Sequence, residues 1–292
     1  MAAVRGRAEA DPPWGGRKRG GTPMLRISGT GASHVGLVRE NNEDAGFVGP
    51  TCMLVADGVG GGAAGEVAAA TAAYVVAATA LLQADRDPVT VLHAGVALAQ
   101  QQLAHGVAME AGRAGMATTL TALMTDGRSF ALAHIGDSRG YVFRNGGLTR
   151  VTRDHTYVQD LVEAGSLDEA DVPMHPWRNV VMRSVNGSVG ERADVRALSL
   201  APGDRVLIAS DGVTDLVAEP WIEEILARKQ DDAAVESLIA AALGQGGRDN
   251  ITCVLATVID GPPVSGDGRL LGALADHTNV VDLAAVRALD SA

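Results

Sequence analysis

Three aspartates lie at the ends of apolar runs that have the length of buried strands, and they constrain the fold more than any other feature. Asp57 and Asp211 each directly follow such a run, and Asp249 comes just before a third, Ile251–Val258. Apolar runs of this length with turn residues at their ends predict buried strands. A side chain at the end of a strand is held by a rigid sheet yet open to solvent, which suits a metal ligand.

We expect the three carboxylates to meet at one edge of a sheet if the last strand runs antiparallel to the first two. Such a group of oxygens binds hard divalent cations. The alternative is a set of turns, because Asp57 and Asp211 each precede a glycine and Asp-Gly is a common turn pair. A fourth aspartate, Asp137, closes another apolar run. Four such coincidences favour the cation site.

The polar run Arg39-Glu-Asn-Asn-Glu-Asp44 adds a second kind of group. The planar guanidinium of an arginine suits bidentate capture of phosphate. Arg39 lies five residues before Asp44, so one segment offers an anion-binding group and a carboxylate for the metal side. The alternative is a solvated loop.

The sequence signatures of other kinds of catalytic or cofactor site are absent or incomplete in this chain. The glycines of residues 60–65 satisfy a dinucleotide-binding pattern, but no second strand ends in an acidic residue about twenty positions later. No D-x-D-x-T nucleophile is present, and neither cysteine has an arginine six residues later. The seven histidines are scattered, so we expect them to be structural.

Composition limits the partners and the compartment. The net charge of −11 argues against nucleic-acid binding through a broad basic surface. Cys52 and Cys253 both lie in apolar runs and are expected to be buried thiols in a reducing compartment. The alanine-rich stretch Val67–Leu82 is short for a membrane span and predicts a core helix. The polar first 23 residues have no apolar signal region. We therefore expect a cytoplasmic protein without membrane association.

Three regions are expected along the chain. Residues 1–24 form a disordered Gly/Arg-rich lead, or a basic tail that contacts nucleic acid or lipid, and translation could begin at Met24. Residues 25–260 form one domain, in which two groups of strands with paired helices between them indicate a layered α+β sandwich. Asn145-Gly146 predicts a hairpin turn. Residues 261–292 form a linker and tail, with docking and disorder both open.

The ordered motifs resemble those of the metal-dependent PPM (PP2C-type) protein serine/threonine phosphatases in their bacterial form. Each motif alone is a weak signal, but the ordered set over residues 25–260 is specific. The motifs are Gly36–Asp44, Ala56–Gly61, Ala64–Glu66, Gly115–Leu120, His134–Gly140, Asp154–Thr156, His175-Pro176, Ser210–Gly212 and Arg248–Thr252.

The resemblance implies a central β-sandwich of two mostly antiparallel sheets, flanked by pairs of helices, with two Mn²⁺ or Mg²⁺ ions and in bacterial members a third. A flap at about residues 153–190 would lie beside the active site. By this resemblance, Asp57 would bridge the two metals and the Gly58 carbonyl would bind one of them. Asp211 and Asp249 would bind the second metal, and Asp137 with Asp211 would hold the third. Arg39 would bind the substrate phosphate, and Glu43 and Asp44 would hold metal-bound waters.

The implied reaction is in-line attack on phosphorus by a hydroxide that bridges the metals. Two departures from the family pattern bear on it. Animal members place a histidine, proposed as general acid, at the position of Gly62, and bacterial members often carry methionine at the position of Val59. The group that protonates the leaving oxygen is therefore open.

The sequence thus predicts a monomeric enzyme that hydrolyses phosphoserine and phosphothreonine in proteins, acting on substrates of serine/threonine kinases in a high-GC bacterium. One alternative is a non-catalytic module of the same fold that binds phosphoproteins, although Arg39, Asp57, Asp211 and Asp249 are all present. Another is a partner-switching phosphatase that acts on anti-sigma-factor antagonists.

Overall fold

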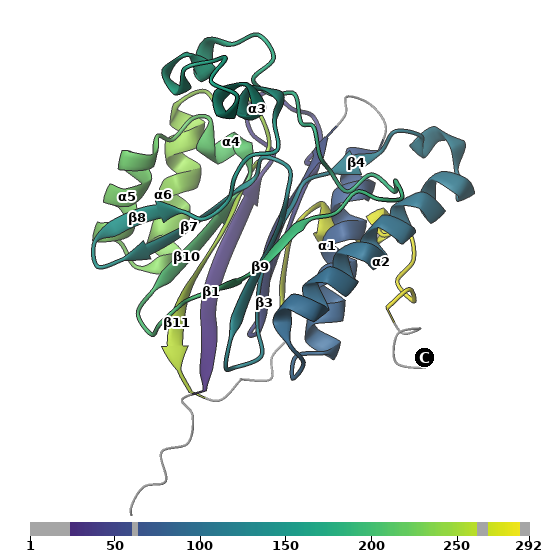
Figure 1. The fold of residues 1–292 in the computed structure, drawn as a ribbon, viewed down its shortest axis with the longest axis horizontal. Helices are drawn as coiled ribbons and strands as arrows, with labels where there is room; N and C mark the ends of the chain where they lie inside the picture. Colours follow the sequence, from purple (N-terminus) through teal and green to yellow (C-terminus); the bar gives the residue numbers. More distant parts are fainter. Residues whose placement is uncertain (1–23, 60–63, 262–267, 287–292) are drawn as a thin grey trace, which may run out of the picture.

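Two antiparallel β-sheets pack face to face and helices cover their outer faces (Figure 1). The computed structural model describes residues 24–59, 64–261 and 268–286. The predicted lead therefore lies outside the described residues, except for Met24. Gly62 and the other glycines at 60–62 lie outside them as well.

The smaller sheet has five strands in the order β1-β11-β10-β7-β8, and each neighbouring pair is antiparallel. The hairpin predicted at Asn145-Gly146 joins β7 and β8, with φ of 53° and 84° at its two residues. This is the positive-φ backbone that a two-residue hairpin loop needs. The strands are β1 Leu25–His34, β7 Arg139–Arg144, β8 Gly147–Arg150, β10 Arg205–Ala209 and β11 Ile251–Asp260.

The larger sheet runs in the order β12-β2-β3-β5-β6-β9, and the short β4 pairs with β3. Its inner face meets that of the smaller sheet through fully buried side chains such as Met53 and Leu123. The strands are β2 Asp44–Val48, β3 Cys52–Val59, β4 Ala117–Thr118, β5 Leu120–Thr125, β6 Phe130–Ile135, β9 Asp194–Leu198 and β12 Arg269–Gly272.

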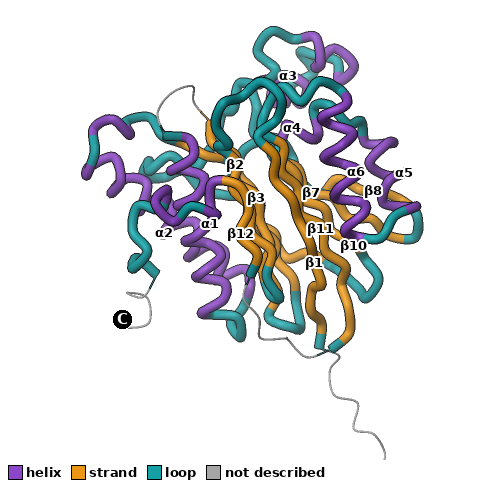
Figure 2. Tube along the Cα trace, turned by 180° about the vertical axis from the view of Figure 1, so that it is seen from behind, coloured by secondary structure: helices purple, strands orange, loops and turns teal. Residues whose placement is uncertain are grey.

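Helices form the two outer layers (Figure 2). The pair α1 (Gly65–Leu82) and α2 (Pro88–Met109) packs on the larger sheet, and the pair α5 (Glu219–Arg228) and α6 (Asp231–Gly244) packs on the smaller. By length and composition α1 could cross a membrane, but 72% of it is buried inside the protein. It is a core helix, as the sequence predicted.

The flap lies between β8 and β9, above one end of the sandwich (Figure 1). It contains helix α3 (Tyr157–Glu163) and the 3-10 helix η2 (Glu169–Met174). A one-turn helix, α4 (Asp211–Thr214), follows β10 close to it.

The predicted layered α+β sandwich is confirmed, with three local differences. The sequence of residues 35–39 predicts part of an opening strand, but β1 ends at His34 and residues 36–38 form a turn. Neighbouring side chains fill the space beside Gly29 and Gly31 of β1. Strand β2 was not foreseen, because it begins with the polar Asp44 and contains Gly46. Residues 261–292 were expected to be a linker and tail, but β12 joins the sheet and the packed chain continues to residue 286.

Truncation of a side chain between the sheets tests this packing. Leu123 is 0% exposed, so Leu123→Ala should lower the free energy of unfolding by about 2–5 kcal/mol through lost burial and a cavity. Leu82→Ala is the control, because Leu82 is 52% exposed. Urea unfolding of both variants measures the difference, and equal losses would contradict the assigned core.

Candidate functional site

The four predicted carboxylates come together at one end of the sandwich, and they come from both sheets. Asp57 lies on β3 of the larger sheet. Asp211 follows β10 and Asp249 precedes β11, and these two strands are antiparallel neighbours in the smaller sheet. The expected antiparallel arrangement therefore holds for Asp211 and Asp249. The three carboxylates do not share the edge of one sheet, as was expected, because Asp57 belongs to the facing sheet. Asp137 lies in the turn from β6 to β7, which crosses between the sheets.

Electrostatics at this end are unfavourable for charged carboxylates. Burial raises the pKa of Asp57 well above its usual range, and the charges of Asp44, Asp211, Asp137 and Asp249 raise it further. Burial also raises the pKa of Asp211, with Asp137 as the next largest cause. A cation at this position would relieve both the desolvation and the mutual repulsion.

Asp137, which is expected at the third-metal site, is also buried and also has a raised pKa. Asp137 is 9% exposed, and burial together with Asp154 and Asp215 raises its pKa to about 7. No group of three or more His, Cys, Asp or Glu side chains within the described residues forms a ready-made metal cage. The carboxylates therefore share one region without converging on one point.

The glycines that follow Asp57 and Asp211 allow close approach rather than turns. A Cβ at Gly212 would stand 1.9 Å from the carbonyl oxygen of Asn250, and a Cβ at Gly58 would stand 2.6 Å from the carbonyl of Gly65. Neither glycine is among the described residues with positive φ. Asp57-Gly58 lies within β3 and Asp211-Gly212 begins α4, so neither pair forms the loop turn that was the alternative for them.

Asp44 is the most deeply buried member of the group, with no solvent exposure. It is paired with Asp57 across β2 and β3, and its Oδ2 accepts a hydrogen bond of 2.8 Å from Ser210 Oγ. Among the described residues, its buried Oδ1 has no hydrogen-bond partner. Burial raises the pKa of Asp44 to about 6. A buried acceptor oxygen left free beside Asp57 fits a site that holds a cation and its water.

Arg39 and Asp249 form an ion pair at the mouth of the site. The Arg39 Nη2 lies 2.8 Å from Asp249 Oδ2, and the two side chains are 49% and 40% exposed. An ion pair so exposed contributes at most about 1 kcal/mol. Either partner can therefore exchange the other for a phosphate or a cation at little cost.

Asn250 attaches the loop that carries Arg39 to β11. Its Nδ2 donates to the carbonyls of Val35 and Asn41 at 2.9 Å, and its Oδ1 accepts from the amide of Glu43 at 2.7 Å. The Glu43 carboxylate lies at the start of α1, where a Cβ on Gly65 would stand 2.4 Å from its Oε2. The sequence motif contained Asn250, but its role was not foreseen because these contacts span more than 200 residues.

A pocket of about 540 Å³ opens between the carboxylates and the flap. Asp137, Asp211 and Asp249 line one side of it, and flap residues such as Gln159 and Arg178 line the other. Asp154 also lines it, and Arg139 and Arg150 both pair with this carboxylate. Asp154 and Asp215 were not predicted as site residues. The only signal was the Asp154–Thr156 motif.

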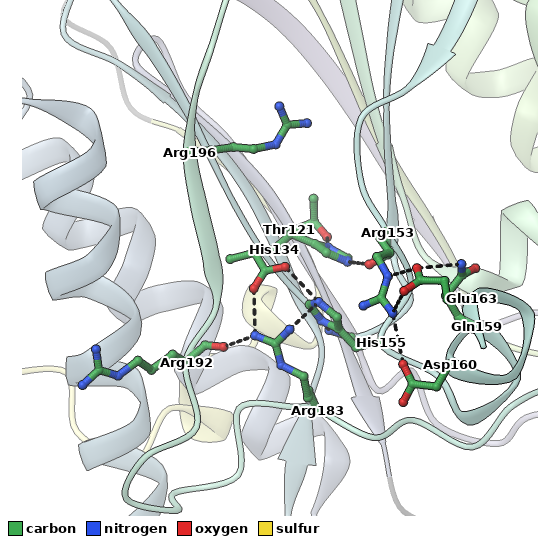
Figure 3. A network of polar contacts seen from close by, with 12 residues as sticks. Thr121, His134, Arg153, His155, Gln159, Asp160, Glu163, Arg183, Arg192 and Arg196 are labelled. Carbon is green, nitrogen blue, oxygen red and sulfur yellow. Dashed lines mark hydrogen bonds and ion pairs between the residues drawn. The ribbon is translucent and has the colours of Figure 1, made fainter.

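Two buried histidines, His134 and His155, lie in a network of polar contacts with residues of the flap (Figure 3). His155 Nδ1 accepts from the amide of Gly136 at 3.1 Å, and His134 lies 2.8 Å from both Thr121 Oγ1 and the carbonyl of Arg153. Burial lowers the pKa of His134 to about 4, which keeps the ring neutral. For these two histidines the structural role predicted from the sequence is confirmed.

Comparisons with known proteins agree on one family. The model of the family "Protein phosphatase 2C" matches residues 30–244. The serine/threonine protein phosphatase PstP of Mycobacterium tuberculosis is 42% identical over 228 residues, which cover 77% of this chain and 44% of that protein. This chain therefore spans less than half the length of that curated relative. The serine/threonine phosphatase stp of Listeria welshimeri is 32% identical over 231 residues, covering 75% of this chain and 91% of that protein.

Solved structures give the same result. A crystal structure of the M. tuberculosis phosphatase PstP has a TM-score of 0.75 and 40% identity, covering 80% of this chain and 98% of that one. The PstP catalytic domain solved in complex with two manganese ions has a TM-score of 0.74 and 39% identity, covering 81% of this chain and all of that one.

The buried charge of Asp44 predicts a pH-dependent stability of the metal-depleted protein. Because its folded pKa is raised to about 6, the stability that Asp44 contributes is present below the unfolded pKa near 4 and is lost as pH rises through 6. Asp44→Asn should therefore be more stable than the wild type at pH 7.5, by up to about 3 kcal/mol. The gain should shrink toward pH 4. Urea unfolding across this range measures it, and a gain that does not vary with pH would contradict the assignment.

Proposed function

The chain belongs to the protein phosphatase 2C family, and from this premise we propose that it is a metal-dependent phosphatase of phosphoserine and phosphothreonine in proteins. The observation that carries the proposal is the gathering of Asp57, Asp137, Asp211 and Asp249 in one region at one end of the sandwich, with Arg39 at its mouth. The relatives named as serine/threonine phosphatases support it. No observation favours the non-catalytic alternative.

The proposed site holds two Mn²⁺ or Mg²⁺ ions. Asp57 would contact both, the Gly58 carbonyl would bind one, and Asp211 and Asp249 would bind the second. Asp137, together with Asp211, would hold a third. The mutual repulsion of these carboxylates and the free Oδ1 of Asp44 support this, as do the two manganese ions of the related PstP structure. When bound, such a pair supplies an activated water nucleophile near neutral pH and offsets negative charge.

The protein's own groups then orient the substrate and the water. The Arg39 guanidinium presents two parallel N–H donors to the phosphoryl oxygens once it leaves Asp249. Asp44 and Glu43 are acceptors that hold water in place, and Asp44 has a free oxygen to do so. Gly62 has no side chain that could protonate the leaving oxygen. The proton must therefore come from water or from another residue.

We infer that the substrates are phosphoproteins made by serine/threonine kinases and that the chain acts as a monomer in the cytoplasm. The two cysteines, Cys52 and Cys253, are buried free thiols, which is consistent with a reducing compartment.

Metal dependence tests the proposed function. The full chain should hydrolyse p-nitrophenyl phosphate and a phosphothreonine peptide with Mn²⁺, and EDTA should stop both reactions. Mutation of a residue that only orients a metal ligand typically lowers metal affinity or activity about 10–100-fold. Loss of a ligand itself, in Asp57→Asn or Asp211→Asn, should therefore lower kcat/KM by more than about 100-fold. The exposed Asp85→Asn is the control. Activity in EDTA, or full activity in Asp57→Asn, would reject the metal assignment.

Arg39→Lys tests the phosphate contact separately. Lysine keeps the charge but lacks the planar fork, so KM for the phosphopeptide should rise about tenfold through the loss of one charge-assisted hydrogen bond. Steady-state kinetics measure it, with Arg228→Lys on the exposed face of α5 as the control. An unchanged KM would remove Arg39 from substrate binding.

A further inference from the structure

The last described segment, residues 268–286, packs along the domain, and we name it the C-terminal strap. Its strand β12 pairs antiparallel with β2 and forms one end of the larger sheet, near α1 (Figure 2). Leu274 and Val286 are 1% and 3% exposed and belong to the same core cluster as α1 and α2. The strap lies beyond residues 30–244, which the family model matches.

Two side chains of α1 fasten the strap. Tyr74 Oη donates to the carbonyl of Leu283 at 2.7 Å, and Thr71 Oγ1 accepts from the amide of Val281 at 3.1 Å. The pairing of β12 with β2 holds the other end. The strap is therefore fixed along its length rather than at one point.

Gly272, the last residue of β12, lies directly against the backbone of Asp44. A Cβ at this position would stand 2.1 Å from the carbonyl oxygen of Asp44 and 2.9 Å from Ser33 Oγ, and φ is +57°. Only glycine permits both the approach and the backbone conformation. Asn42 links Ser33 to Asp44, because its Nδ2 donates to Ser33 Oγ and its Oδ1 accepts from the amide of Asp44.

The same contact lies behind the candidate metal centre. Asp44 is paired with Asp57 across β2 and β3, and Ser210 holds its Oδ2. Without β12, β2 would end the sheet, with one row of its backbone groups unpaired. The strap therefore supplies the missing neighbour of the strand that carries Asp44.

We propose that Gly272 is a positioning residue for the metal centre: it lets the C-terminal strap close on β2 and fixes Asp44 beside Asp57. The proposal rests on the proposed function, because it gives Asp44 a place next to the bound ions. Gly272 is not one of the candidate ligands, and it acts through the backbone of Asp44.

Gly272→Ala and Gly203→Ala form a matched pair for the test. Both glycines have positive φ, but a Cβ at Gly203 would meet nothing within 4 Å. Both variants should therefore melt at a lower temperature than the wild type through backbone strain. Only Gly272→Ala should bind Mn²⁺ more weakly, by about tenfold, as for other residues that orient a metal site. Calorimetric titration of the metal-depleted full chain measures the affinity. Hydrogen exchange should show faster exchange at residues 44–48 in Gly272→Ala alone.

A second pair keeps the test decisive if Gly272→Ala does not fold. Thr71→Val removes one of the two hydroxyls that hold the strap. Thr79→Val removes a buried hydroxyl of the same helix whose hydrogen bond, among the described residues, goes to the carbonyl of Val75. Weaker Mn²⁺ binding and faster exchange at residues 44–48 are expected for Thr71→Val alone. Equal Mn²⁺ affinity within each pair would overturn the role of the strap while leaving the proposed function intact. A wild-type chain that binds no Mn²⁺ would overturn both.

Discussion

The repulsion among carboxylates at one end of the sandwich is the constraint on which the rest of the structure depends. Burial is the largest cause of the raised pKa values of Asp57 and Asp211, and the charges of neighbouring carboxylates raise them further. A fold gains nothing from such a group unless a cation occupies it. The surrounding contacts therefore have one common effect, which is to hold acidic groups where their charges oppose one another.

Those contacts come from parts of the chain far apart in sequence. Gly212 allows α4 to approach Asn250, and Asn250 in turn holds the loop that carries Arg39. Ser210 bridges from the smaller sheet to Asp44 in the larger one. His155 connects the base of the flap to the turn before Asp137. The two facing sheets supply a rigid frame, and these polar contacts set the positions at its open end.

The sequence predicts well what depends on local pattern. The apolar runs before Asp57 and Asp211 predicted strands β3 and β10, and Asn145-Gly146 predicted the hairpin between β7 and β8. What depends on tertiary pairing was not predictable in the same way. Asp57 joins Asp211 and Asp249 from the facing sheet, because sheet membership is decided by strand order and not by the run itself. Strand β12 and the contact of Gly272 with Asp44 were missed for the same reason: a short segment with glycines has no period to read, and its partner lies over 200 residues away.

The count of Mn²⁺ ions bound by the metal-depleted chain tests the central claim most directly. Calorimetric titration near neutral pH should give at least two ions per wild-type chain. Proton release should accompany binding and grow as the pH is lowered toward 6, because burial raises the pKa of Asp44 to about 6 and that of Asp137 to about 7. Asp57→Asn should lose this binding. Unchanged stoichiometry and affinity in Asp57→Asn would show that the carboxylates at this end of the sandwich do not form the metal centre.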